Sequence, residues 1–128
     1  MTLVRRFEDL QAWQSGRRLA KTVYVLTASE RFRTDFGLID QIQRASVSVM
    51  NNVVEGFDSG SQAEFVRFLG YARRSASEVQ SCLYVALDRG RIEQSSFQSA
   101  YDEAQQARNL IGGFIRYLKA PMHKQSLS

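Results

Sequence analysis

The only proline, Pro121, stands near the end of the 128-residue chain, so no residue before it blocks a helix by lacking an amide hydrogen. Glycines punctuate the sequence at Gly37, Gly56, Gly60 and Gly90. Between these points apolar residues recur at helical spacing, and no β-type alternation competes with it. The pattern predicts four long helices joined by short loops.

Charges and a glycine indicate the limits of the first two helices. The first is predicted over residues 9–29, because Glu8 and Asp9 place negative charge at the positive N-terminus of a helix. The second is predicted over residues 38–55, ending at Gly56, a residue suited to a left-handed cap.

Capping boxes indicate where the other two helices begin. Ser61 and Glu64 form such a box, and the helix that follows is predicted to end before Gly90. Ser95 and Gln98 repeat the pattern, which predicts a fourth helix from residue 95 or 96 to just before residue 121.

Short connections between long helices leave neighbouring helices antiparallel. The predicted fold is therefore an all-α, antiparallel up-and-down four-helix bundle. We expect one domain over residues 1–120 and a disordered tail over residues 121–128. That tail holds the only histidine, His123.

The first two predicted helices carry more apolar surface than one small bundle can bury. Apolar residues cover over half of the first helix's circumference, and Arg44 is the only charge between Asp40 and Glu55 on the second. In a bundle of this size each helix normally keeps a solvated face. The surplus predicts that the chain self-associates.

Two polar strips run along the second and third predicted helices. The first contains Arg44, Ser48, Asn51 and Glu55 with Asn52 at its edge; the second contains Arg67, Tyr71, Arg74 and Glu78 with Ser75 close by. We interpret Arg44, Ser48, Asn52, Glu55, Ser75 and Glu78 as a structural network that fixes helix register or a subunit contact. The alternative is a ligand or catalytic site. Arg17, inside the first helix's apolar arc, is expected to pair with Glu55 or Glu78.

The sequence offers no recognisable catalytic, metal or cofactor site. The single histidine has no ordered partner for acid–base chemistry, and the single cysteine, Cys82, is interpreted as a small buried side chain. No cluster of metal ligands and no phosphate-binding loop occur. Gly112 and Gly113 are expected to mark a close helix crossing. We therefore expect neither an enzyme, a cofactor, a metal nor a small-molecule substrate.

Basic residues exceed acidic ones, 17 to 13, and arginine's planar fork suits phosphate. The candidate nucleic-acid-binding residues are Arg17, Arg18, Lys21, Arg73, Arg74, Arg116 and Lys119. A solvated charged surface is the alternative interpretation. No membrane span and no secretory signal are recognisable, so we expect a cytoplasmic protein without a membrane partner.

Several motifs together resemble a known family. They are Phe7-Glu8-Asp9-Leu10, Trp13-Gln14, Phe36-Gly37-Leu38, Gln41-Ile42, Arg44-Ala45, Ser48, Asn52, Glu55-Gly56, Glu64-Phe65, Arg67-Phe68-Leu69, Ala72, Ser75 and Glu78. The string resembles the four-helix-bundle family encoded in intervening sequences of bacterial 23S rRNA genes, over residues 7–118. The chain departs from the usual pattern at Gln43, where a second arginine is common, and at Met50, where a proline often kinks the helix.

The resemblance implies a barrel-like homopentamer. Through related accessory proteins of diversity-generating retroelements, it also implies a reverse transcriptase or another nucleic-acid enzyme as a possible partner. The leading hypothesis is a non-catalytic oligomeric scaffold that binds RNA, DNA or a ribonucleoprotein through arginine-rich surface. One rival is a purely structural or protein-interaction oligomer. Another is an enzyme built on Arg44, Glu55 and Glu78.

Overall fold

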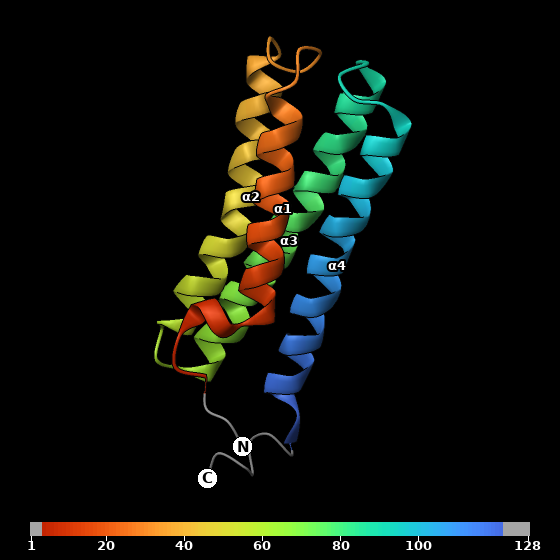
Figure 1. Ribbon diagram of the computed structural model, residues 1–128. Coiled ribbons are helices and arrows are strands. Elements are labelled where there is room, and N and C mark those ends of the chain that lie inside the picture. Colours follow the sequence, from red (N-terminus) through yellow and green to blue (C-terminus); the bar gives the residue numbers. More distant parts are fainter. Residues whose placement is uncertain (1–3, 122–128) are drawn as a thin grey trace.

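The computed structural model describes residues 4–121. A short 3₁₀ helix and four α-helices follow one another: η1 (Phe7–Asp9), α1 (Gln11–Thr27), α2 (Phe36–Phe57), α3 (Gln62–Asp88) and α4 (Gln94–Lys119). The α-helices lie side by side and alternate in direction (Figure 1), which confirms the predicted all-α four-helix bundle. Residues 122–128 of the predicted tail, with His123, lie outside the described residues.

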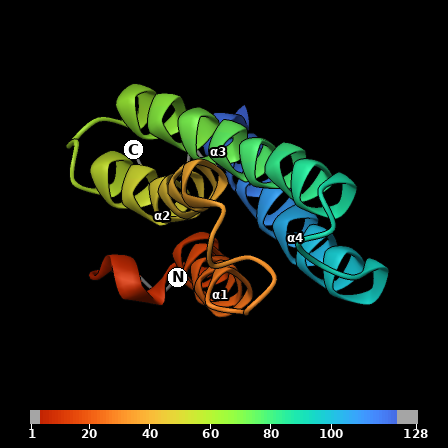
Figure 2. The same cartoon turned by 90° about the horizontal axis from the view of Figure 1, so that it is seen from above.

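Each α-helix packs against two neighbours. α1 and α3 both contact α2 and α4, whereas the diagonal pairs do not approach each other in the described chain (Figure 2). The enclosed core is built from branched apolar side chains and alanines, among them Leu19, Val23, Ile42, Val49, Leu69, Val79, Leu83 and Ile111. Phe32 and Ile92, from two loops, close the core at one end. No helix in residues 4–121 has the length and hydropathy needed to cross a bilayer.

The first helix begins later than predicted. Leu10 has extended backbone angles, φ −77° and ψ 127°, and its side chain is buried, so α1 starts at Gln11. Glu8 and Asp9 lie in η1, which folds back so that the Phe7 and Trp13 rings meet edge to face, 5.2 Å apart. The burial of Leu10 thus separates the acidic pair from the helix that it was expected to begin.

Gly56 does not end the second helix as predicted. α2 extends from Phe36 to Phe57, and the glycines with left-handed backbone are Gly60 and Gly90, at φ 82° and 71°. A Cβ at residue 56 would lie 2.8 Å from Phe65 Cδ1, closer than real carbons approach. Gly56 therefore allows α3 to pack closely on α2.

The two predicted capping boxes have different outcomes. Ser61 Oγ accepts the Glu64 amide hydrogen at 3.1 Å, as predicted, although the Glu64 carboxylate bonds Arg67 instead of reaching back. The box at Ser95 is wrong: the N-cap of α4 is Glu93, whose side chain makes no capping bond. Because the backbone is already helical from Gln94, Ser95 is inside the helix.

An aspartate joins the two loops at one end of the bundle. The Asp35 carboxylate accepts hydrogen bonds from Arg89 Nε at 2.8 Å and Arg91 Nε at 3.0 Å, and Arg31 Nε donates to the Gly90 carbonyl at 3.0 Å. The Arg89 bond, and after it the Arg91 bond, hold the pKa of Asp35 below its usual value. We call Asp35, Arg89 and Arg91 the loop clasp.

Candidate functional site

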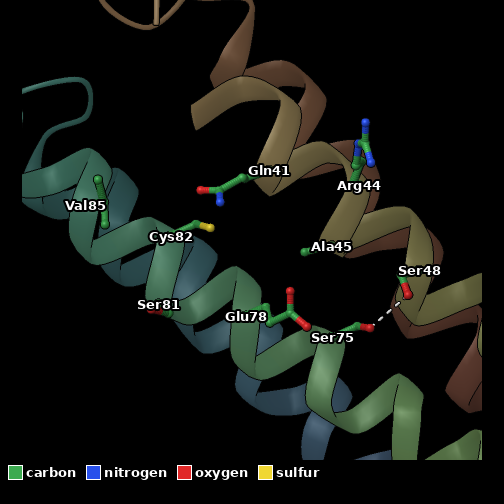
Figure 3. Close-up of a pocket in the computed structure, with 9 residues that line it drawn as sticks. All are labelled: Gln41, Arg44, Ala45, Ser48, Ser75, Glu78, Ser81, Cys82 and Val85. Atoms are coloured by element: carbon green, nitrogen blue, oxygen red, sulfur yellow. Dashed lines mark hydrogen bonds between the residues drawn. The ribbon is translucent and has the colours of Figure 1, made fainter. Parts of the chain in front are cut away.

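A polar groove lies between α2 and α3 (Figure 3). Ser48 from α2 and Ser75 from α3 share a hydrogen bond of 2.9 Å at its edge. Asn52 Nδ2 donates to both the carbonyl and the hydroxyl oxygen of Ser48, each at 2.9 Å. The Ser48–Ser75 bond therefore links the two helices, and Asn52 holds the Ser48 hydroxyl from within α2.

The charged members of the predicted network do not join it within the chain. Arg44 is 80% exposed and pairs with Asp40, one turn earlier on α2, at 3.2 Å. Figure 3 shows it pointing out of the groove while the Glu78 carboxylate points into it. Helical side chains lean toward the N-terminus of their own helix, which brings Arg44 to Asp40 rather than to α3. Among the described residues, neither Glu55 nor Glu78 forms an ion pair within 4 Å.

On α3 the second strip pairs locally as well. Arg67 bonds both Glu64, at 2.7 Å, and the Tyr71 hydroxyl, at 3.1 Å. Arg74 lies over the Tyr71 ring, 5.5 Å from its centroid. The side chains of the strip therefore contact one another along the surface of α3, each with a residue one turn away.

Cys82, which also lines the groove, is half-buried and points toward α2 (Figure 3). Burial and the nearby Glu78 carboxylate raise the pKa of its thiol. A raised pKa keeps the sulfur protonated at neutral pH, whereas a reactive cysteine needs a thiolate. The groove is thus lined by a weakly nucleophilic thiol, that of Cys82, and by the Ser48 and Ser75 hydroxyls, which bond each other.

The first basic surface is the outer face of α1. Arg17, Arg18 and Lys21 are exposed there and line a surface hollow with Trp13. The Arg17 guanidinium lies over the Trp13 ring, 5.7 Å from its centroid, instead of pairing with Glu55 or Glu78 as expected. Because Trp13 is one turn before Arg17, the indole is the nearest surface for this side chain. We call Arg17, Arg18 and Lys21 the α1 basic face.

The second basic surface follows the contact between α3 and α4. A Cβ placed on Gly112 would lie 3.6 Å from Arg116 Nη1 and 3.7 Å from Arg73 Cζ. Both guanidinium groups thus cover the same glycine, one from each helix. These are ordinary contact distances, so Gly112 does not mark the tight crossing that the sequence suggested. We call Arg73 and Arg116 the arginine pair.

The other two candidate residues lie apart from this pair. Arg74 follows Arg73 directly, so the two side chains diverge by about 100° around the helix. Lys119 lines a hollow with Gln62, Ala63 and Val66 at the end of the bundle where α3 begins. The structure therefore divides the seven candidates between the α1 basic face, the arginine pair and two separate positions.

Arg108 extends the second basic surface and was missed by the sequence analysis. Its Nη1 donates to the side-chain oxygens of Gln80, at 3.1 Å, and Gln105, at 3.2 Å, across the contact between α3 and α4. Gln80 itself is buried. The sequence spacing could have indicated it, because residues 108, 112 and 116 are four apart and therefore share one face of a helix.

Known proteins resemble the chain in sequence and in fold. The family of 23S rRNA-intervening sequence proteins matches residues 8–113. A crystal structure of a protein of unknown function from the S23 ribosomal protein family of Bacteroides thetaiotaomicron is similar in fold, with a TM-score of 0.75 and 20% identity over 82% of this chain and 98% of that one. No curated protein matches the sequence. Because the family match spans most of the bundle, including the α2–α3 groove, the α1 basic face and Arg73, the chain belongs to the 23S rRNA-intervening sequence protein family.

Proposed function

We propose that the protein is a non-catalytic, homo-oligomeric scaffold that binds nucleic acid, or a ribonucleoprotein enzyme such as a reverse transcriptase, through its arginine-rich surfaces. The observation that carries this proposal is a set of unneutralised cations. Arg17, Arg18, Lys21, Arg73 and Arg116 have no carboxylate within 4 Å among the described residues. The net charge of +4 leaves these groups available for an anionic partner.

The contrast with the remaining arginines supports the same proposal. Arg44, Arg67 and Arg89 each bond a carboxylate of the chain, so their charge is largely compensated locally. The α1 basic face and the arginine pair contain none of these compensated arginines, although the uncompensated Arg74 shares the Tyr71 ring with Arg67. An interface for a polyanion requires such a surplus in one place, since each phosphate contact releases condensed counterions.

Arg17 on Trp13 adds a feature suited to single-stranded nucleic acid. Unpaired bases stack on aromatic rings and also on the planar guanidinium groups of arginine. RNA is the first probe to use, because the family is named for 23S rRNA intervening sequences.

The test is fluorescence anisotropy with a short labelled RNA and the matching DNA at two salt concentrations. We expect binding with little sequence preference and a log–log salt slope of about −0.7 to −0.9 per phosphate neutralised. R18Q/K21Q should bind more weakly, with a shallower slope. R33Q/R44Q is the matched control, since it removes the same charge from arginines already paired with Glu30 and Asp40.

The outcomes separate the two classes of function. If the wild type binds neither RNA nor DNA at low salt, the nucleic-acid proposal is wrong and the rival, a structural or protein-interaction oligomer, gains support. If R33Q/R44Q weakens binding as much as R18Q/K21Q, only net charge matters and the α1 basic face has no special role.

A further inference from the structure

The arginine pair is unusual because two like charges converge without a counter-charge. Both guanidinium groups lie within 4 Å of one point, the position that a Cβ of residue 112 would occupy. Arg116 Nη1 and Arg73 Cζ are therefore no more than about 7 Å apart. Two positive charges at that range repel each other, and an anion between them relieves the repulsion. Gly112 itself is buried beneath them.

Among the described residues, no carboxylate lies within 4 Å of the Arg73, Arg108 or Arg116 guanidinium group. The polar and aromatic side chains that meet across the α3–α4 contact include Gln80 with Gln105 and Arg108, and Tyr84 with Phe97 and Tyr101. The region therefore collects positive charge without neutralising it.

Arg108 adds a third uncompensated charge one turn from Gly112. Its hydrogen-bond acceptors within residues 4–121 are amide oxygens, which orient the guanidinium but do not neutralise it. Its Nε is buried and has no hydrogen-bond partner among the described residues. A buried donor without a partner lowers the free energy of unfolding.

These features fit an oxyanion with several acceptor oxygens. Phosphate suits them best, because each planar guanidinium can donate two parallel hydrogen bonds to it and the negative charge relieves the repulsion. We propose that Arg73 and Arg116 hold one phosphate group above Gly112, with Arg108 adding charge beside it. Where that phosphate belongs to a nucleic-acid backbone, the inference rests on the proposed function. Where it belongs to a free phosphate compound, it does not.

Thermal unfolding is the first arm of the test. We compare inorganic phosphate with sodium chloride at equal ionic strength for the wild type, R73Q/R116Q and the control R33Q/R44Q. Phosphate raises the melting temperature of proteins generally. The informative quantity is therefore the rise in melting temperature on replacing chloride by phosphate, the phosphate increment, which R33Q/R44Q should keep and R73Q/R116Q should lose in part. In chloride alone, R73Q/R116Q should unfold at the same or a higher temperature than the wild type, since the repulsion is gone.

RNA binding by anisotropy is the second arm. If the phosphate belongs to the backbone, R73Q/R116Q should lower RNA affinity by about tenfold or more at 0.1 M salt, with a salt slope shallower by about 1.4 for two lost contacts. R33Q/R44Q should keep its affinity. If RNA affinity is unchanged in R73Q/R116Q but the phosphate increment is lost, the site takes a free phosphate compound.

The remaining outcomes separate this inference from the proposed function. RNA binding by the wild type, with no difference between R73Q/R116Q and the control in either arm, overturns the phosphate site and leaves the function standing. No RNA binding, with the phosphate increment lost in R73Q/R116Q, overturns the function and supports the site. Circular dichroism of R73Q/R116Q confirms that the variant is folded in each case.

Discussion

Two glycines inside helices show how a single missing carbon can act in opposite ways. A Cβ at residue 56 would lie 2.8 Å from Phe65 Cδ1 and 3.0 Å from Phe68 Cβ, whereas a Cβ at residue 70 would meet nothing within 4 Å. Gly56→Ala should therefore destabilise the bundle, by about 1–3 kcal/mol as for other overpacked sites. Gly70→Ala should stabilise it by about 1 kcal/mol, because alanine favours the helix.

Chemical denaturation of both variants measures these effects. The pair controls for the change in helix propensity, since both substitutions add the same methyl group within a helix. Equal stabilisation by the two substitutions would show that α3 can move away from Gly56 without loss. The close packing of the two helices at that point would then be wrong.

Sequence reasoning could locate the glycines but not assign their roles. Gly56 was expected to end a helix and Gly112 to mark a tight crossing, whereas the close approaches are at Gly56 and at Gly16, whose Cβ would lie 3.2 Å from the Met50 amide nitrogen. A glycine reports only that a side chain is absent. Whether backbone, an aromatic ring or a guanidinium fills the space depends on the neighbouring helix.

The loop clasp makes the end of the bundle sensitive to acid. The Asp35 side chain is only 12% exposed and bonds arginines more than 50 residues away along the chain. Because its folded pKa is lowered, the stabilisation is fully present above the unfolded value of about 3.9 and is lost as pH falls through the folded pKa. Asp35→Asn should therefore lower the melting temperature at neutral pH.

Melting temperatures of the wild type and Asp35→Asn across pH 7 to 2.5 test the clasp. The difference should stay constant at neutral pH and narrow below about pH 4, where the wild-type carboxyl becomes protonated. Glu30→Gln is the control, since Glu30 is an exposed carboxylate with one long ion pair, 3.5 Å, in its own loop. A difference that persists unchanged to pH 2.5 would show that shape, and not charge, gives Asp35 its effect.

The two serines of the predicted boxes give a second comparison at the level of the helix. Ser61→Ala should cost about 1 kcal/mol, because it removes the acceptor of the Glu64 amide. Ser95→Ala should be nearly neutral, since Ser95 is exposed and inside the helix. Urea denaturation measures both, and an equal loss for the two variants would contradict the observed start of α4.

The presence of each helix was predictable because apolar residues recur at helical spacing over many turns. The residues at which the helices begin and end were harder to predict. The limits depend on single residues whose environment is tertiary: Leu10 is buried and delays α1, while Asp35 is held by the loop clasp and lies just before α2. The polar strips show the same division. Their spacing placed Ser48 and Ser75 in one network, and the structure has a hydrogen bond between them. It could not show that Arg44 pairs with Asp40 on its own helix.

At the scale of the whole molecule, one apolar area stays uncovered by the chain's own packing. Ala20, Tyr24, Val25, Ala28 and Met50 line a shallow hollow between α1 and α2, together with Arg17 and Lys21, so the hollow borders on the α1 basic face. Val25 is 71% exposed, and Phe36, at the start of α2, is 77% exposed. This is the part of the predicted apolar surplus that the core leaves over, and we predict that a second copy of the chain covers it.

Light scattering on purified protein tests this prediction with matched variants. We expect the wild type to exceed the 14.6 kDa of one chain, and the family resemblance predicts a pentamer. Val25→Asp should shift the protein toward the monomer, because a buried, unpaired carboxylate is costly at an interface. Ala63→Asp, an equal charge change at an exposed position near the start of α3, should leave the assembly intact. A wild-type monomer at micromolar concentration would contradict self-association, and a stable dimer or tetramer would contradict only the subunit number. If Val25→Asp stays fully assembled, the contact between copies lies elsewhere on the bundle. The next surface to substitute is then the α2–α3 groove, into which the Glu78 carboxylate points without an ion pair in the described chain.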